Sequence, residues 1–213
     1  MRKFFTLVLI TIFITSCEED DSGSVTTPTV QYSETTANAI FYTEGNSVSP
    51  SIEWNGEQGS ISLDGNPDGT SVNSTTGKIT WTKLLPAGSH DFQVLVANSA
   101  GQVTVPFTLE NPLQGFFEGT YSGSSYFAIE FFDDGTCTVL ANSSNNPTIG
   151  SGTFVVDGDE VVADYTYEDT DEDYSVRATI SQTSNAAALE GNWYFEHGAT
   201  TGQEGGTMDI TLQ

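Results

Sequence analysis

Short runs in which apolar and polar residues alternate constrain this chain more than any other feature. An alternation with a period of two places the apolar side chains on one face of a β-strand. Clusters of Gly, Asn, Asp and Pro separate the runs and favour turns, whereas no long stretch has the spacing of an amphipathic helix. The 213 residues therefore predict an all-β protein of one or two domains.

Residues 112–213 contain eight such runs, joined in part by tight turns at Asp134-Gly135 and Asp157-Gly158. The apolar residues expected on one face are Phe117, Tyr121, Phe127, Ile129, Phe131, Cys137, Val139, Phe154, Val156, Val161, Ala163, Tyr165, Tyr167, Tyr174, Val176, Ala178, Ile180, Leu189, Trp193, Phe195, Met208, Ile210 and Leu212. A closed, eight-stranded antiparallel meander β-barrel buries such a face and leaves no edge strand. The many aromatic residues favour a filled interior, with a small pocket at one mouth as the alternative.

Residues 30–111 carry a different pattern. The segments SVNSTTGKITW, from Ser71 to Trp81, and FQVLVANSAG, from Phe92 to Gly101, resemble the immunoglobulin-like domains of bacterial surface proteins, which are related to cadherin-like sandwiches. The resemblance implies an immunoglobulin-like β-sandwich with a spacer or adhesive role. The acidic calcium motifs of cadherin-like domains are not recognisable in this sequence.

The barrel half resembles the lipocalin-like small barrels that are appended to bacterial surface lipoproteins. The resemblance rests on LQGFFEGTY from Leu113, FDDGT from Phe132, LEGNW from Leu189 and GGTM from Gly205. It implies barrel architecture. The N-terminal signature of the lipocalin family is not cleanly present, so the binding of small hydrophobic molecules is not carried over from that family.

The N-terminus reads MRKFFTLVLITIFITSC. Two basic residues precede an apolar run from Phe4 to Ile14, which is too short for a permanent membrane span and typical of a signal peptide. The sequence up to Cys17 resembles a bacterial lipobox, which implies removal of residues 1–16 and acylation of Cys17. The acyl chains would anchor the protein in a membrane. An ordinary signal peptide followed by an unrelated cysteine is the alternative.

Four acidic residues, Glu18, Glu19, Asp20 and Asp21, follow the cysteine. They resemble the export signal of surface lipoproteins of the Bacteroidota kind, and a solvated tether is the simpler alternative. Residues 17–29 are also rich in Ser, Thr, Gly and Pro and are predicted to form an acidic flexible tether. Together these features predict an outer-membrane, lipid-anchored protein that faces the cell exterior.

The charge of the chain excludes one class of partner. Only 5 Lys and Arg residues accompany 29 Asp and Glu residues, for a formal net charge of −24 at pH 7. A nucleic-acid-binding protein needs a basic surface to displace the counterions of the phosphates. We therefore expect no nucleic-acid partner. The expected contact with the membrane is made through the acylated Cys17.

Candidate catalytic residues are scarce. Catalysis by Ser or Cys needs a positioned histidine, and neither His90 nor His197 lies near a nucleophile motif. Cys137 lies in an alternating run and is predicted to be buried and inert. A pair of carboxylates for glycoside hydrolysis cannot be singled out among 29 acids. We expect no catalytic residues and no enzyme, with a hydrolase ranked last among the alternatives.

The acidic run of residues 168–173 was compared with a calcium loop. Asp169, Asp171 and Asp173 match positions 1, 3 and 5 of an EF-hand, but Tyr174 replaces the required Gly and Ile180 the required Glu. The run is therefore predicted to be a solvated hairpin tip, and weak binding of calcium is the alternative. No cofactor is expected.

A second set of aromatic residues alternates out of the inward set. Phe116, Tyr126, Phe132 and Tyr194 are candidates for a sugar-stacking surface on the barrel, and packing under loops or against the other domain is the alternative. The leading hypothesis is a surface binding or adhesion protein that captures glycan or docks on an outer-membrane complex. The second hypothesis is a lipocalin-like carrier of a small apolar ligand, which requires an open lumen.

Overall fold

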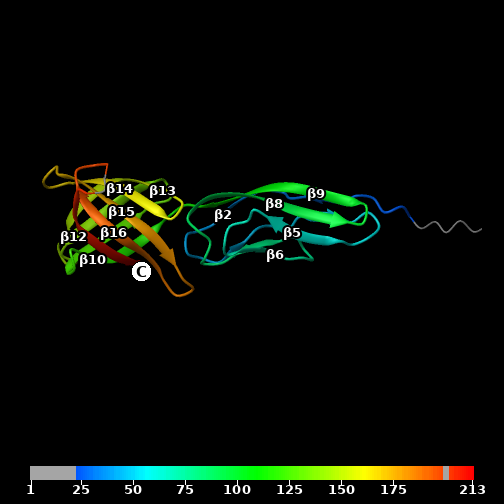
Figure 1. The fold of residues 1–213 in the computed structure, drawn as a ribbon, viewed down its shortest axis with the longest axis horizontal. Coiled ribbons are helices and arrows are strands. Elements are labelled where there is room, and N and C mark those ends of the chain that lie inside the picture. Colours follow the sequence, from blue (N-terminus) through cyan, green and yellow to red (C-terminus); the bar gives the residue numbers. More distant parts are fainter. Residues whose placement is uncertain (1–22, 199–201) are drawn as a thin grey trace, which may run out of the picture.

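The computed structural model describes residues 23–198 and 202–213, and every regular element among them is a β-strand. The strands form a sandwich and a closed barrel that lie end to end (Figure 1). The predicted fold class is thus confirmed. The described part of the chain has no helix with the length and hydrophobicity needed to cross a bilayer. Cys17 and the acidic residues 18–21 lie outside the described residues.

The sandwich is built from two main sheets and a short strand pair. The larger sheet has the order β2 (Thr36–Asn38), β9 (Gly101–Asn111), β8 (Gly88–Asn98) and β5 (Ser60–Asp64). The smaller sheet has the order β3 (Gly45–Asn46), β7 (Ile79–Trp81) and β6 (Thr70–Val72), and β1 (Thr29–Gln31) pairs with β4 (Ser51–Glu53). Only β2 and β9 pair in parallel among the described strands.

The long β8–β9 hairpin makes the largest contribution to the sandwich core. Phe92 of β8 is buried opposite Phe107 of β9, and Val94, two residues further along β8, is buried on the same face. They belong to one hydrophobic cluster with Ile79 and Trp81 of β7. This cluster is separate from that of the barrel, so the sandwich has a core of its own.

The barrel is an antiparallel meander of eight consecutive strands. They are β10 (Gly115–Tyr121), β11 (Ser125–Phe131), β12 (Thr136–Asn142), β13 (Thr148–Asp157), β14 (Glu160–Tyr167), β15 (Asp173–Gln182), β16 (Ala187–Phe195) and β17 (Glu204–Leu212). The first strand pairs with the last, from Phe117 opposite Leu212 to Tyr121 opposite Met208. Every strand therefore has two neighbours, and no edge remains for pairing with another chain.

The interior of the barrel follows the predicted alternation except at Phe195, which lies beyond the register shift in β16 and is exposed. Ile129, Val139 and Ala163 are fully buried, and Cys137 is 2% exposed. The prediction that Cys137 is buried is thus confirmed, and burial raises the pKa of its thiol to about 12. Close strand contacts require glycine in places: a Cβ on Gly152 would lie 1.9 Å from the Asp164 carbonyl oxygen.

The end of the barrel next to the sandwich is filled by residues from outside the barrel strands. Phe41, which precedes β3, and Ala87, which precedes β8, are buried in the barrel's own hydrophobic cluster together with Leu113 of the connecting segment. The Phe41 ring lies 6.2 Å from the Phe117 ring, measured between centroids. The sandwich therefore plugs this end of the lumen.

Hydrogen bonds hold the same junction together. The Gln182 side-chain amide donates to the carbonyl oxygens of Lys83 (2.8 Å) and Leu85 (3.0 Å). The Tyr42 hydroxyl donates to the Thr183 carbonyl oxygen at 2.9 Å, and the Lys83 ammonium lies 4.9 Å from the centroid of the Tyr42 ring. These contacts join the two bodies in one orientation.

We predict that Phe41→Ala destabilises the barrel although residue 41 belongs to the sandwich. Removing a buried phenylalanine costs about 3–5 kcal/mol, because the site loses transfer free energy and keeps a cavity. Urea unfolding followed by near-UV circular dichroism measures this loss. Ile40→Ala is the matched control, because Ile40 is 61% exposed and its truncation should cost under about 0.5 kcal/mol. If the two substitutions lower the free energy of unfolding equally, the conclusion that Phe41 fills this end of the barrel is contradicted.

Candidate functional site

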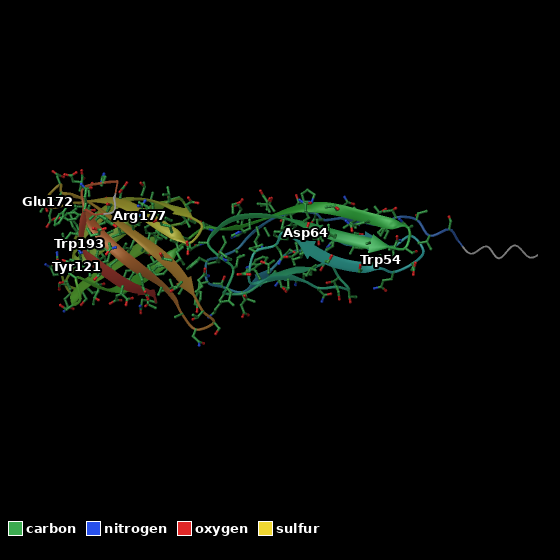
Figure 2. The ribbon with its side chains drawn as sticks, viewed as in Figure 1. Trp54, Asp64, Tyr121, Glu172, Arg177 and Trp193 are labelled. Atoms are coloured by element: carbon green, nitrogen blue, oxygen red, sulfur yellow. The ribbon has the colours of Figure 1, made fainter. Side chains whose placement is uncertain are left out.

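The barrel end away from the sandwich holds a cavity of about 230 Å³. Figure 2 shows Tyr121, Glu172 and Trp193 at this end, whereas Trp54 lies at the opposite end of the molecule. Successive strands of a meander run in opposite directions, so the last residues of β10, β12, β14 and β16 meet at one rim. The cavity lies within that rim, and we call it the mouth cavity.

Six aromatic rings line the mouth cavity: Tyr121, Phe127, Tyr165, Tyr167, Tyr174 and Trp193. Tyr165 and Tyr167 share the inward face of β14 because they are two residues apart, and Tyr174 of β15 pairs directly with Tyr165. The ring centroids of these three tyrosines lie 5.1 to 6.0 Å apart. They form one continuous aromatic wall.

The opposite wall comes from the strands near the barrel closure. Tyr121 and Trp193 pack edge to face, with 5.8 Å between ring centroids, and the Trp193 indole N–H donates to the Ser122 hydroxyl at 3.1 Å. Trp193 also lies 6.1 Å from Tyr174, which connects the two walls. The Phe195 ring, 4.9 Å from Trp193 and 61% exposed, extends the aromatic surface outward.

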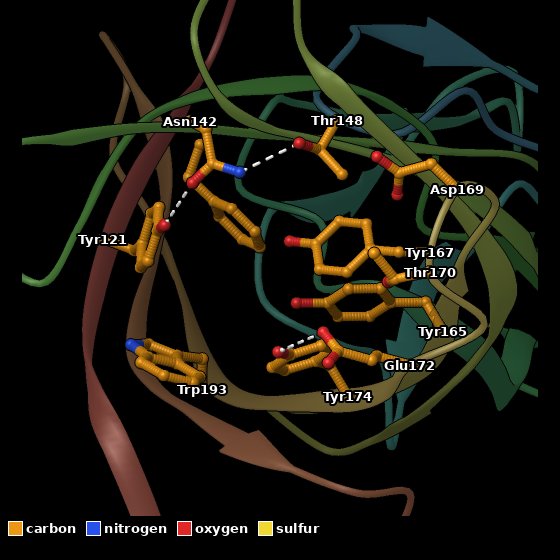
Figure 3. A pocket seen from close by; sticks show the side chains of 11 residues that line it. Tyr121, Asn142, Thr148, Tyr165, Tyr167, Asp169, Thr170, Glu172, Tyr174 and Trp193 are labelled. Carbon is orange, nitrogen blue, oxygen red and sulfur yellow. Dashed lines mark hydrogen bonds between the residues drawn. The ribbon is translucent and has the colours of Figure 1, made fainter.

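Asn142 is the polar residue of the cavity wall with the most defined contacts. Its side-chain carbonyl accepts a hydrogen bond from the Tyr121 hydroxyl at 2.6 Å, and its amide donates to the Thr148 hydroxyl at 2.9 Å (Figure 3). Both ends of the Asn142 amide are thus engaged within the protein. This fixes the orientation of Tyr121.

The hydroxyl groups of Tyr165 and Tyr167 point into the mouth cavity (Figure 3). Burial raises the pKa of Tyr167 to about 12, and burial, reinforced by the neighbouring Tyr167, raises the pKa of Tyr165 as well. Both phenols therefore remain neutral at physiological pH. The cavity has amphipathic walls, made of aromatic faces with a few hydroxyl groups.

Two carboxylates stand at the rim. Asp169 and Glu172 belong to the tip of the β14–β15 hairpin and line the cavity. The tip is held by backbone hydrogen bonds from the Tyr167 N–H to the Glu172 carbonyl and from the Asp171 N–H to the Tyr167 carbonyl, both 3.0 Å. The Tyr174 hydroxyl donates to a Glu172 carboxylate oxygen at 3.2 Å. Among the described residues, the lining contains no Lys, Arg or His.

The four aromatic residues predicted for a sugar-stacking surface are not brought together. Tyr126 near the start of β11 and Phe132 just after its end lie six residues apart, which is about 20 Å along a strand. Phe116 is half-buried on β10, and Phe132 is 38% exposed. They share no common surface with Tyr194, which is 3% exposed.

Tyr194 follows the alternative expectation, packing under a loop, for a reason that alternation does not reveal. The pairing of β16 with β17 shifts register between Trp193 and Tyr194. The segment after β16 folds back along the outer face of the barrel: the Gly198 N–H donates to an Asp164 carboxylate oxygen at 2.9 Å, and the Glu196 N–H donates to the Asp173 carbonyl at 2.9 Å. Tyr194 and its partner Ser175 are consequently buried on that face.

The candidate calcium ligands do not assemble into a metal site. In the described ranges, no group of three or more His, Cys, Asp or Glu side chains could hold a metal ion. Asp173 accepts a hydrogen bond from the Thr166 hydroxyl at 2.7 Å and lies 3.5 Å from His197. Residues 168–172 connect β14 to β15, so the predicted hairpin tip is confirmed.

Neither histidine lies in the mouth cavity. His90 contacts the Pro86 carbonyl oxygen at 2.9 Å, near the junction of the two bodies. His197 contacts the Tyr165 carbonyl oxygen at 3.1 Å, from outside the barrel wall. Cys137 is buried and does not line the cavity.

The sequence predicted the inward position of the six aromatic residues and favoured a filled interior, with a small pocket at one mouth as the alternative. A usable signal was present, because the inward positions next to the acidic run are Tyr165, Tyr167 and Tyr174. Elsewhere along the same strands the inward positions are aliphatic, such as Val161 and Val176. Tyrosine is suited to a site with one apolar side and one wet side.

The chain matches no protein-family model and no curated protein by sequence. Its function is therefore inferred from its own residues.

We predict that Tyr167 contributes to a loss of stability at alkaline pH. A phenol whose pKa is about 12 when folded, against 10.0 as the reference, stabilises the fold fully below pH 10. That contribution is lost as the pH rises from 10 to 12, because the unfolded chain ionises first. Denaturant unfolding of Tyr167→Phe should show a smaller decline over this range than the wild-type chain. Parallel pH profiles for the two proteins would contradict the assignment.

Proposed function

We propose that this chain is a lipid-anchored surface protein that captures a small ligand in the mouth cavity of its barrel, without catalysis. The cavity carries the proposal. It is walled by six aromatic side chains and a few polar groups, a composition typical of ligand-binding pockets.

The contrast between the two barrel ends supports a binding role. At the sandwich end, Phe41 and Leu113 fill the lumen with well-packed apolar side chains. At the other end, the tyrosines line a cavity of about 230 Å³ that opens at the rim instead of filling the lumen. A cavity lined by neutral phenols and open at a rim is more useful for a ligand than for stability.

The size of the cavity limits the ligand. Its volume equals that of roughly eight water molecules in the liquid. This is below the usual range of pockets for drug-sized molecules, which begins at about 300 Å³. We infer a compact ligand, or the terminal group of a larger one such as a glycan or lipid. A long apolar chain would not fit.

The arrangement of the two bodies supports a role for the sandwich as a stalk. The described chain starts at residue 23 at the outer end of the sandwich (Figure 1), and Tyr121 and Trp193 of the mouth cavity lie at the far end of the barrel (Figure 2). If Cys17 is acylated and anchored as its sequence predicts, the mouth faces away from the membrane. Docking on an outer-membrane complex stays a prediction.

We predict that a ligand of the mouth cavity raises the melting temperature of the chain. The Cys17→Ala variant of the full chain, which lacks the acylation site, is heated with a library of sugars, amines, organic acids and apolar compounds. A ligand at a hundred times its Kd should raise Tm by about 5–10 °C. A screen without any stabilising compound would overturn the proposal.

Two substitutions locate the binding. Thr170→Trp places a large ring at the exposed hairpin tip beside the cavity and should abolish the shift in Tm. Val155→Trp adds the same ring on the outer wall, where Val155 is 66% exposed, and should leave the shift unchanged. A shift that survives Thr170→Trp would place the ligand elsewhere.

A further inference from the structure

The mouth cavity combines three features that together select a ligand class: aromatic faces, carboxylates at the rim and the lack of a basic residue in its described lining. We propose that the ligand is an organic cation with a methylated ammonium group. This inference rests on the proposed function and names the chemistry of the same site.

The aromatic walls favour a cation over a neutral apolar group of the same shape. The negative face of a tyrosine or tryptophan ring attracts an ammonium group within about 6 Å of its centroid, most strongly where water is excluded. Tyr121 and Trp193 form one wall, and the cluster of Tyr165, Tyr167 and Tyr174 forms the other (Figure 3). A methylated ammonium presents apolar methyl groups to both walls and keeps its charge.

The rim adds electrostatic selection. Asp169 and Glu172 line the entrance, and Glu168, Asp171 and Asp173 are their neighbours in the same hairpin. The charge of −24 on the chain adds a long-range potential of the same sign. Organic anions such as carboxylates and phosphates are therefore disfavoured.

None of the described Lys and Arg residues lines the mouth cavity, and two of them are engaged elsewhere. Lys78, Lys83 and Arg177 are the only Lys and Arg residues in the described ranges. Arg177 pairs with Glu160 at 2.9 Å, and Lys83 lies over the Tyr42 ring at the junction. The Lys83–Tyr42 contact is an instance of the interaction that we propose for the ligand.

The polar groups of the cavity argue against a neutral sugar as the preferred ligand. Sugars are recognised by several directed hydrogen bonds in addition to ring stacking. Here both ends of the Asn142 side-chain amide are engaged by Tyr121 and Thr148, and Glu172 accepts from Tyr174. The Tyr165 and Tyr167 hydroxyl groups, the ring faces and the negative charge of the rim remain available to a ligand. A methylated ammonium group uses the ring faces and the charge and needs no directed donor or acceptor.

A matched pair of probes tests the inference. Calorimetric titration of the Cys17→Ala chain compares choline with dimethylbutanol, the neutral analogue in which carbon replaces the ammonium nitrogen. We expect choline to bind at least about tenfold more tightly. If choline and dimethylbutanol bind with equal affinity, and Thr170→Trp abolishes the binding of both, the inference of a cationic ligand is overturned. The proposed function then still stands. If neither probe binds but another class of compound from the melting-temperature screen does, the cationic ligand is likewise overturned and the proposed function stands.

Variants separate the contribution of charge from that of the rings. Asp169→Asn and Glu172→Gln should each weaken choline binding about fivefold at low salt and leave binding of the neutral analogue unchanged. Glu190→Gln, an equal charge change at an exposed outer position, is the control. Tyr174→Leu should weaken choline binding more than Tyr174→Phe, because only the phenylalanine keeps an aromatic face. Equal effects of rim and control variants would overturn the proposal.

The same ammonium group could be free or carried on a phosphocholine headgroup. Sedimentation with phosphatidylcholine vesicles distinguishes the two sources. If the chain sediments with the vesicles and Glu172→Gln reduces this, a headgroup is the ligand. If choline binds without sedimentation, the ligand is a free cation.

Discussion

The pairing of β10 with β17 is the contact on which the barrel depends. It joins the first strand to the last, from Phe117 opposite Leu212 to Tyr121 opposite Met208. Without it, the eight strands would form an open sheet with two exposed edges and no lumen. Closure also brings Tyr121 of the first strand against Trp193 of β16, so one wall of the mouth cavity exists because the two ends of the barrel segment meet.

Two kinds of side chain divide the closed lumen along its axis. Near the sandwich, Phe117, Phe131 and the intruding Phe41 fill the space and supply stability. Near the mouth, tyrosines take the corresponding inward positions, and their hydroxyl groups keep that end partly polar. One barrel thus combines a packed core with a cavity, because a step of two residues along a strand changes depth but not face.

The strands and their inward faces could be predicted from the sequence because a period of two is a local property. The separation of the sandwich strands from the barrel strands could also be predicted from composition and motifs, because these too are local properties of the sequence. The burial of Tyr194 could not be predicted from the alternation, since it depends on a register shift in β16 and on a loop that folds back over the barrel wall. The insertion of Phe41 into the barrel could not be predicted either, since it depends on how the sandwich and the barrel pack against each other. Alternation identifies an inward tyrosine but not whether space remains beside it.

The plug at the junction has a kinetic consequence. Because Phe41, Ala87 and Leu113 close the base, a molecule in the lumen has no passage through the described barrel at that end. A ligand captured as proposed would enter and leave by the rim, so the hairpin tip that carries Asp169 and Glu172 would influence both its association and its dissociation rate. The barrel would act as a pocket with a single opening, which holds one molecule until it dissociates through that opening, and not as a channel.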